Sequence, residues 1–78
     1  MSKYSVSVYY EGYDWKKDDK IDAIAQDCGG REVGSGMMIG TNERDVQCVF
    51  EDESDAARFQ KRVSDLEWLS RIDDVIEY

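Results

Sequence analysis

The chain has 78 residues, 41% hydrophobic and 36% charged, and its 18 acidic residues outnumber its 10 basic ones to give a formal net charge of -8. A chain of this length buries only about 60% of its unfolded surface, so it builds one small domain around one core. No apolar run approaches the roughly 20 residues of a membrane-spanning helix, and the N-terminus lacks the apolar segment of a secretion signal. We therefore expect a soluble, cytoplasmic protein with a single domain over residues 1–78.

The N-terminal part predicts a strand followed by a helix. Apolar and aromatic residues alternate with polar ones over residues 4–10, which is the pattern of a half-buried strand. From about Trp15 the apolar spacing changes to that of one helical face. This face consists of Ile21, Ile24, Ala25 and Cys28. Asp14 or Asp18 is expected to cap the start of the helix, and the glycine pair after it is expected to end it.

Residues 31–39 and 44–51 predict a β-hairpin, because the turn-forming residues 40–43 separate them and the second arm alternates. Gly34 and Gly36 interrupt the first arm, which indicates a bulge or a close backbone approach. The hairpin is therefore expected to be less regular in its first arm than in its second.

A second helix and a last strand are predicted in the C-terminal part. The helix is expected to start behind Asp52 or Ser54 and to run to about Glu67. Its apolar face consists of Ala56, Phe59, Val63 and Leu66. Residues 73–78 alternate loosely, which is consistent with a final strand.

The order strand, helix, strand, strand, helix, strand predicts an α+β ferredoxin-like βαββαβ plait. In this fold two helices pack on one face of a four-stranded antiparallel sheet. The residues expected in the core are Val6, Val8, Val46, Cys48 and Phe50 from the sheet and Ile21, Ile24, Phe59 and Val63 from the helices. The residues expected on the other face, open to solvent or a partner, are Ser5, Ser7, Tyr9, Asp45, Gln47 and Glu51.

One stretch resembles part of an RNA-recognition motif, namely its third strand and second helix. The residues that carry this likeness are Val49-Phe50-Glu51-Asp52 and Asp55-Ala56-Ala57. The likeness covers about a fifth of the chain, and a shared ferredoxin-like junction accounts for it. The positions that would hold base-stacking aromatics are Asp45 and Gln47 here, so we expect no direct binding of nucleic acid.

The usual residues of catalysis are missing. The chain has no His, and no Ser or Cys lies in a recognisable nucleophile motif, so we expect no catalytic residues and no enzyme activity. The acidic clusters do not match a calcium loop, and no metal or other cofactor is expected. Cys28 and Cys48 show no CxxC spacing and are interpreted as reduced, buried thiols.

Acidic charge is concentrated at residues 51–78, which hold nine acidic and four basic residues. Such a surface repels nucleic acids and anionic membranes and attracts basic protein surfaces. We therefore expect a non-enzymatic inhibitor or adaptor that engages a basic partner surface, such as one that normally holds nucleic acid. A small, acidic chain of this kind is similar in type to virus-encoded inhibitors of bacterial defence that act as nucleic-acid mimics.

The candidate partner-binding residues are Glu51, Asp52, Glu53, Asp55, Asp73, Asp74, Trp15 and Trp68. Two alternatives stay open for them, because solubility alone explains many surface acids and tryptophans can close the ends of a small core. A different function also stays open, in which the chain is a dimeric ferredoxin-like regulatory or assembly module that senses a small molecule. Such a homodimer would pair through exposed strand edges or open faces.

Overall fold

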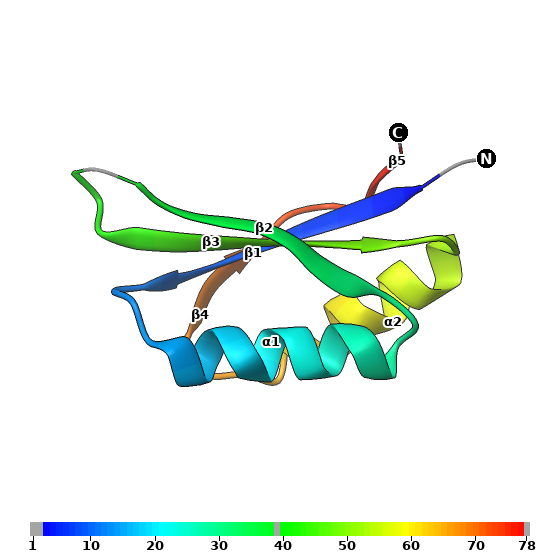
Figure 1. Cartoon of the computed structure of the whole chain (residues 1–78), viewed down its shortest axis with the longest axis horizontal. Coiled ribbons are helices and arrows are strands. Elements are labelled where there is room, and N and C mark those ends of the chain that lie inside the picture. Colours follow the sequence, from blue (N-terminus) through cyan, green and yellow to red (C-terminus); the bar gives the residue numbers. More distant parts are fainter. Residues whose placement is uncertain (1–2, 39, 78) are drawn as a thin grey trace.

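The computed structural model describes residues 3–38 and 40–77, which form two helices and one antiparallel sheet (Figure 1). The strands are β1 (Tyr4–Glu11), β2 (Arg31–Met38), β3 (Glu43–Phe50), β4 (Leu69–Ile72) and β5 (Ile76–Glu77), and the helices are α1 (Trp15–Asp27) and α2 (Glu53–Val63). The strand order is β2-β3-β1-β4, and β5 pairs with β1 beyond β4. This confirms an α+β fold consistent with a ferredoxin-like plait, except that the sheet has five strands where four were predicted. Within the described chain, neither helix is long and apolar enough to cross a membrane.

Acidic side chains fix the start of each helix. The Asp14 carboxylate accepts the Lys16 N–H at 2.9 Å, and the Asp52 carboxylate accepts the Ser54 N–H at 2.9 Å. Each bond satisfies a backbone donor that has no partner within the helix. Of the two candidates predicted for each cap, Asp14 and Asp52 are the caps, and Asp18 and Ser54 lie inside the helices.

The turn from α1 to β2 depends on two glycines. Gly29 has a φ of +90°, which residues with a side chain rarely adopt. A Cβ on Gly30 would lie 2.3 Å from the Phe50 ring, so the backbone passes directly against the core at this point. The predicted helix end is confirmed, and the second glycine is required by packing.

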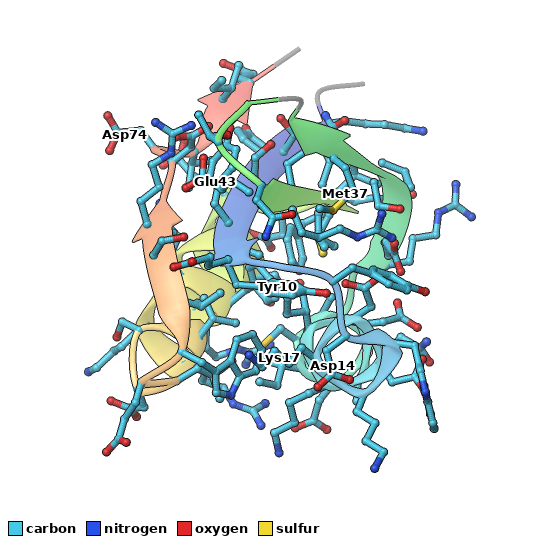
Figure 2. All side chains as sticks on the ribbon, turned by 90° about the vertical axis from the view of Figure 1, so that its left-hand side faces the viewer. Tyr10, Asp14, Lys17, Met37, Glu43 and Asp74 are labelled. Carbon is cyan, nitrogen blue, oxygen red and sulfur yellow. The ribbon has the colours of Figure 1, made fainter. Side chains whose placement is uncertain are left out.

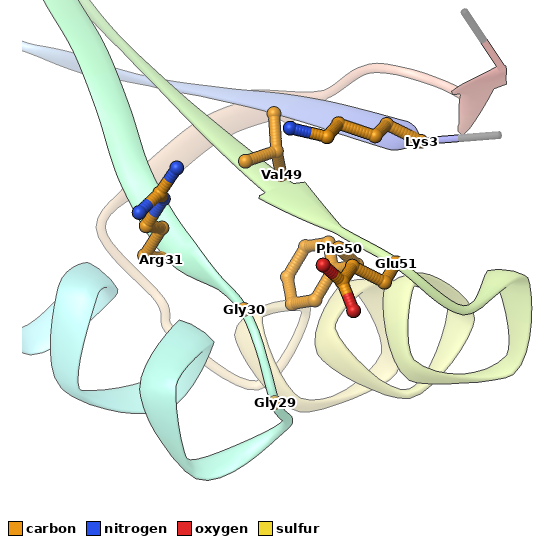
Figure 3. A pocket seen from close by; sticks show the side chains of 7 residues that line it. All are labelled: Lys3, Gly29, Gly30, Arg31, Val49, Phe50 and Glu51. Atoms are coloured by element: carbon orange, nitrogen blue, oxygen red, sulfur yellow. The ribbon is translucent and has the colours of Figure 1, made fainter. Parts of the chain in front are cut away.

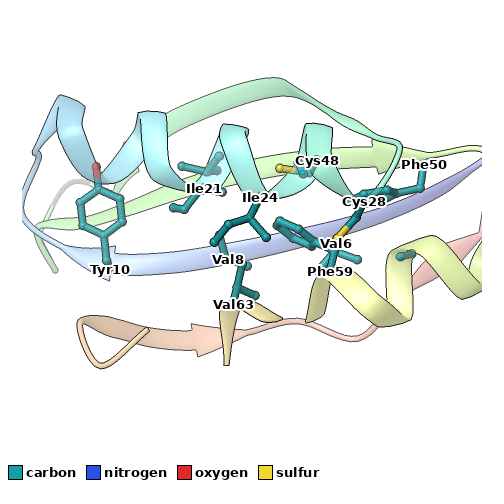
Figure 4. Packing of buried hydrophobic residues seen from close by; sticks show 13 residues of the cluster. Val6, Val8, Tyr10, Ile21, Ile24, Cys28, Cys48, Phe50, Phe59 and Val63 are labelled. Carbon is teal, nitrogen blue, oxygen red and sulfur yellow. The ribbon is translucent and has the colours of Figure 1, made fainter. Parts of the chain in front are cut away.

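The hydrophobic core lies between the sheet and the two helices (Figure 4). All nine residues predicted for it from the sequence are buried. The cluster also contains Tyr10, Ala25, Cys28 and Ala56. The rings of Phe50 and Phe59 lie 5.1 Å apart and join β3 to α2.

The open face of the sheet is mostly as predicted, with one exception. Ser5 and Val49 are paired across β1 and β3, and they are only 6% and 7% exposed. The Lys3 side chain lies across Val49, and Ile76 pairs with Ser5 on the other side (Figure 3). The prediction that Ser5 is open to solvent is therefore wrong: Ser5 lies between paired strands on both sides, opposite Val49 and Ile76.

The hairpin of β2 and β3 is confirmed, and its register runs from Arg31 opposite Val49 to Met38 opposite Glu43. The expected bulge occurs as a register shift between Glu32 and Gly34. Ile39, which was predicted to end the first arm, lies outside the described residues.

The C-terminal prediction needs correction. Helix α2 ends at Val63 and not near Glu67, and the single strand predicted at 73–78 is replaced by β4 and β5, with Tyr78 outside the described residues. Leu66 lies in the turn after α2, where its N–H donates to the Val63 carbonyl at 2.9 Å. Its side chain still packs against the core. The apolar spacing of the helix therefore continues in the sequence to Leu66, although the helix itself has ended.

Strand β4 was not predicted, because a bulge interrupts the alternation of its apolar residues. Its register against β1 shifts between Tyr9 and Tyr10, so that Ile72 pairs with Val8 and Leu69 pairs with Tyr10. Both β4 residues therefore lie on the core side although they are three positions apart. This spacing is typical of a helix and not of the alternation expected for a strand.

Candidate partner interface

The predicted acidic residues come from two segments that flank the first half of β1. Phe50 pairs with Tyr4 on one side of β1, and Glu77 pairs with Tyr4 on the other. Figure 1 shows the start of α2 and strand β5 at the same end of the molecule. We call the seven carboxylates of these segments the acidic end: Glu51, Asp52, Glu53, Asp55, Asp73, Asp74 and Glu77.

Two of these carboxylates are fixed at the start of α2. Asp52 accepts both the N–H and the hydroxyl of Ser54, at 2.9 and 2.8 Å. These bonds lower the pKa of Asp52, so its negative charge persists in mildly acidic solution. Asp55 accepts a bond from Arg58 at 3.0 Å, which neutralises part of its charge.

Asp73 is fixed at the other side of β1. Its carboxylate accepts the Tyr9 hydroxyl at 2.7 Å, and its carbonyl accepts the Gln60 side chain at 2.8 Å. The bond to Asp73, with some burial, raises the pKa of Tyr9. The Arg71 guanidinium lies 4.0 Å from the centre of the Tyr9 ring and covers this contact.

Glu51, Glu53 and Asp74 are exposed and, within residues 3–38 and 40–77, form no hydrogen bond or ion pair through their side chains. The fold therefore uses some carboxylates of the acidic end for its own contacts and leaves these three available.

A hollow of about 330 Å³ lies beside the acidic end (Figure 3). Its lining consists of Lys3, Gly29, Gly30, Arg31, Val49, Phe50 and Glu51. Two basic side chains therefore share the hollow with Glu51, and the surface here carries both signs of charge. After Glu51, at the start of α2, the surface is mostly acidic, with Arg58 paired to Asp55.

The two tryptophans lie apart from the acidic end. Trp15 is 59% exposed at the start of α1, and Figure 1 shows this position at the opposite end of the molecule from the start of α2. Trp68 packs against the core, with its ring 5.5 Å from that of Tyr10 at 84°. The amine of Lys17 lies 5.3 Å from the centre of the Trp68 ring. The structure thus places the two acidic segments along the two sides of the first half of β1 and the tryptophans away from them.

A polar network beneath α1 was not predicted. The Arg44 guanidinium donates to Asp18 at 2.7 and 3.2 Å and to the Ser35 hydroxyl at 3.0 Å. The Tyr10 hydroxyl donates to the second Asp18 oxygen at 2.5 Å. Figure 2 views this end, with Tyr10 between the sheet and α1. Burial and the bond to Asp18 raise the pKa of Tyr10 to about 12.

The sequence held a signal for this network. Asp18 lies on the same helical face as Ile21 and Ala25, and Arg44 alternates in phase with Val46. A charged residue at a core position of two elements that pack together indicates a buried ion pair.

The remaining candidates for chemistry are the two cysteines and the acidic clusters. Cys28 and Cys48 are buried free thiols, and burial raises the pKa of Cys48 to about 12, so that its reactive thiolate does not form at neutral pH. In the described part of the chain, no group of three or more His, Cys, Asp or Glu side chains is arranged to hold a metal ion.

Comparison with models of known protein families and with curated protein sequences finds no match for this chain.

Proposed function

We propose that this chain is a non-enzymatic binding domain of the ferredoxin-like type, acting as an inhibitor or adaptor that engages a basic surface of a partner protein through the acidic end. The observation that supports this proposal is the convergence of two acidic segments on the two sides of β1. A local excess of negative charge attracts a cationic partner over several ångströms and accelerates its association.

The arrangement of the acidic end favours a partner whose cations lie in rows. The segments on either side of β1 are separated across the strand by two strand spacings, roughly 10 Å, and Asp73, beside Ser7, is also displaced along β1 from Glu51. A protein groove that holds nucleic acid presents basic side chains to phosphates along two flanks, so the acidic end can act as a mimic of those phosphates. The fixed positions of Asp52 and Asp73 favour this use, because ordered charges lose little freedom on binding.

A charge-neutralised variant tests the proposal. The interface variant combines Glu51→Gln, Glu53→Gln and Asp74→Asn, which remove three charges that the fold does not use. The control variant combines Asp19→Asn, Asp65→Asn and Glu67→Gln, three exposed carboxylates outside the acidic end. Both variants change the net charge equally, and equal melting temperatures would show that both remain folded.

Each protein is used to capture partners from a cell lysate at low and high salt, with quantification by mass spectrometry. We expect the unmodified chain and the control variant to retain the same basic protein, and the interface variant to bind it about tenfold more weakly at low salt. High salt should release it from all three. Equal retention by the interface variant, or capture that salt does not affect, would contradict the proposal.

A dimeric assembly module is the second candidate function. The observation that favours it is that β2, the strand at one end of the sheet order, pairs on one side only among residues 3–38 and 40–77. This candidate predicts that the chain self-associates.

A further inference from the structure

Strand β2 presents an open edge. Within the described chain it pairs with β3 on one side and with no strand on the other. Its last six residues, 33–38, contain no charged residue and no proline. Val33 and Met37 are 47% and 41% exposed. Protected edges usually carry lysine, proline or a cover, and an edge without them accepts another strand.

Two backbone hydrogen bonds show toward which neighbouring strand the backbone N–H and C=O groups of β1 point. The Ser7 carbonyl accepts the Asp73 N–H at 2.9 Å, toward β4 and β5. The Gly12 N–H donates to the Asn42 carbonyl at 2.7 Å, on the β3 side. Both backbone groups of a residue in an antiparallel strand point to the same neighbour, and successive residues alternate. The even-numbered residues of β1 therefore bond toward β3.

The same alternation identifies the outward groups of β2. Val8 bonds toward β3, so its partner Val46 uses its backbone groups for β1. Ser35 lies opposite Val46 and cannot bond to it, so the N–H and C=O of Ser35 point away from the sheet. Met37, two residues further along, points the same way.

Helix α1 closes the beginning of this edge. The Glu32 N–H, which also faces outward, donates to the Asp22 carboxylate at 3.1 Å. The open part of the edge therefore begins at Val33.

We propose that the open edge of β2 pairs with β2 of a second copy of this chain, antiparallel and around a two-fold axis. Gly36 lies on the axis, and Ser35 of one copy faces Met37 of the other. Each of these two symmetric pairs exchanges both backbone hydrogen bonds, because these are the residues whose groups point outward. The sheets of the two copies become continuous.

The strand is self-complementary in this register, as a two-fold interface requires. Glu32 faces Gly40 and Arg31 faces Thr41 of the other copy, so no like charges are opposed. Gly36 has no side chain to hinder the approach at the axis. The uncharged edge has little to attract a strongly basic strand, so a second copy fits it better than the partner of the acidic end.

The dimer is independent of the acidic end and responds to salt in the opposite direction. Each copy carries a net charge of -8, so two copies repel one another and salt weakens the repulsion. Salt should therefore strengthen dimerisation, whereas it should weaken the capture of a basic partner.

Sedimentation of the full chain over a wide range of concentration, at low and high salt, tests the proposal. We expect a monomer of 9.0 kDa in equilibrium with a dimer, and more dimer at high salt. Met37→Lys places a charge at the paired edge and should weaken the dimer about tenfold, since symmetry makes it act twice. Met37→Pro should also weaken it, because it removes an outward N–H and no bond to β3.

Ile76→Lys is the control, because Ile76 is an exposed apolar residue, 57% exposed, on the other side of the sheet. This variant should dimerise like the unmodified chain. Amide exchange adds a readout at single residues. The Ser35 and Met37 amides should exchange more slowly as protein concentration rises, whereas the Gly34 and Gly36 amides should be protected at every concentration.

Three results would overturn the proposal. The first is a monomer at every concentration and salt. The second is a dimer that neither Met37 variant weakens. The third is protection of the Ser35 amide that appears only when a foreign basic peptide is added, which would assign the edge to a different strand.

Discussion

The two edges of the sheet differ in length, charge and cover. Strand β2 is eight residues long, and its last six residues are uncharged. The opposite edge is divided between β4 with four residues and β5 with two, and charged residues lie in and between them. Figure 2 shows Met37 of β2 and Asp74 on opposite sides of the sheet. One edge is thus protected against a further strand and the other is open.

The protected edge is also part of the acidic end. Asp73 accepts a side chain of α2 through its carbonyl and the Tyr9 hydroxyl through its carboxylate, and Asp74 is exposed beside it. Charges that discourage strand pairing on this side therefore supply the proposed binding surface. The two proposed contacts therefore use opposite edges of the sheet, one through charge and the other through backbone pairing.

The largest expected effect comes from the network that holds the β2 side. Asp18→Ala removes the partner of Arg44, whose side chain is 15% exposed, and leaves its charge uncompensated. We expect a loss of about 3–5 kcal/mol in the free energy of unfolding, measured with urea. The exposed neighbour serves as control, because Asp19→Ala should change stability by less than about 0.5 kcal/mol.

Two results distinguish the effect of an uncompensated buried charge on stability from the effect of lost packing. If Asp18→Ala cost no more than Asp19→Ala, the network would not support the β2 side. The double variant Asp18→Leu/Arg44→Met should lose much less free energy of unfolding than Asp18→Ala, because it leaves no unpaired charge.

The next effect is alkaline destabilisation through Tyr10. Its pKa is raised from 10.0 to about 12 in the folded chain, so the folded state holds the proton more tightly than the unfolded state. The stabilisation is complete below pH 10 and is lost as pH rises through 12, in total about 2–3 kcal/mol. Urea unfolding across this range measures it.

The matched variant for this prediction is Tyr10→Phe, which cannot ionise at this position. It should be less stable at neutral pH but should lose much less further stability between pH 10 and 12. An equal alkaline loss in both proteins would assign the effect to other tyrosines, such as Tyr9 on the protected side.

The smallest expected effect concerns the cover of the protected edge. Gln60→Ala removes the donor to the Asp73 carbonyl and should cost about 1 kcal/mol in thermal or urea unfolding. Gln26→Ala is the control, because the side-chain amide of Gln26 donates to the Asp22 carboxylate, four residues earlier in the same helix, in a solvent-exposed bond. Equal stability of the two variants would mean that α2 does not help to protect this edge.

Much of the fold was predictable because local signals agreed with packing. Three local signals each identify an element or its boundary without reference to the rest of the chain. They are the alternation of apolar residues in β1 and β3, the Asp14 and Asp52 caps, and the glycine pair. The C-terminal region was less predictable, because Leu66 packs into the core from a turn and the bulge in β4 sets Leu69 and Ile72 three residues apart.

The candidate site was predictable in composition but not in arrangement. The sequence identifies Glu51–Asp55 and Asp73–Asp74 as acidic, yet only the pairing of β3 and β5 with β1 shows that the two segments flank the same strand. The position of Trp68 depends on a ring contact with Tyr10, which sequence spacing does not reveal. The open edge of β2 depends on strand order, which follows from the whole fold.

The bond between Asp22 and the Glu32 N–H also limits how any strand can align with β2. Because this donor is occupied, an incoming strand finds its first free backbone groups only after the bulge, and it cannot slide toward Arg31 to form a longer ladder. A single carboxylate on α1 thereby excludes the alignments that extend past Val33 toward Arg31, which the repetitive backbone would otherwise permit.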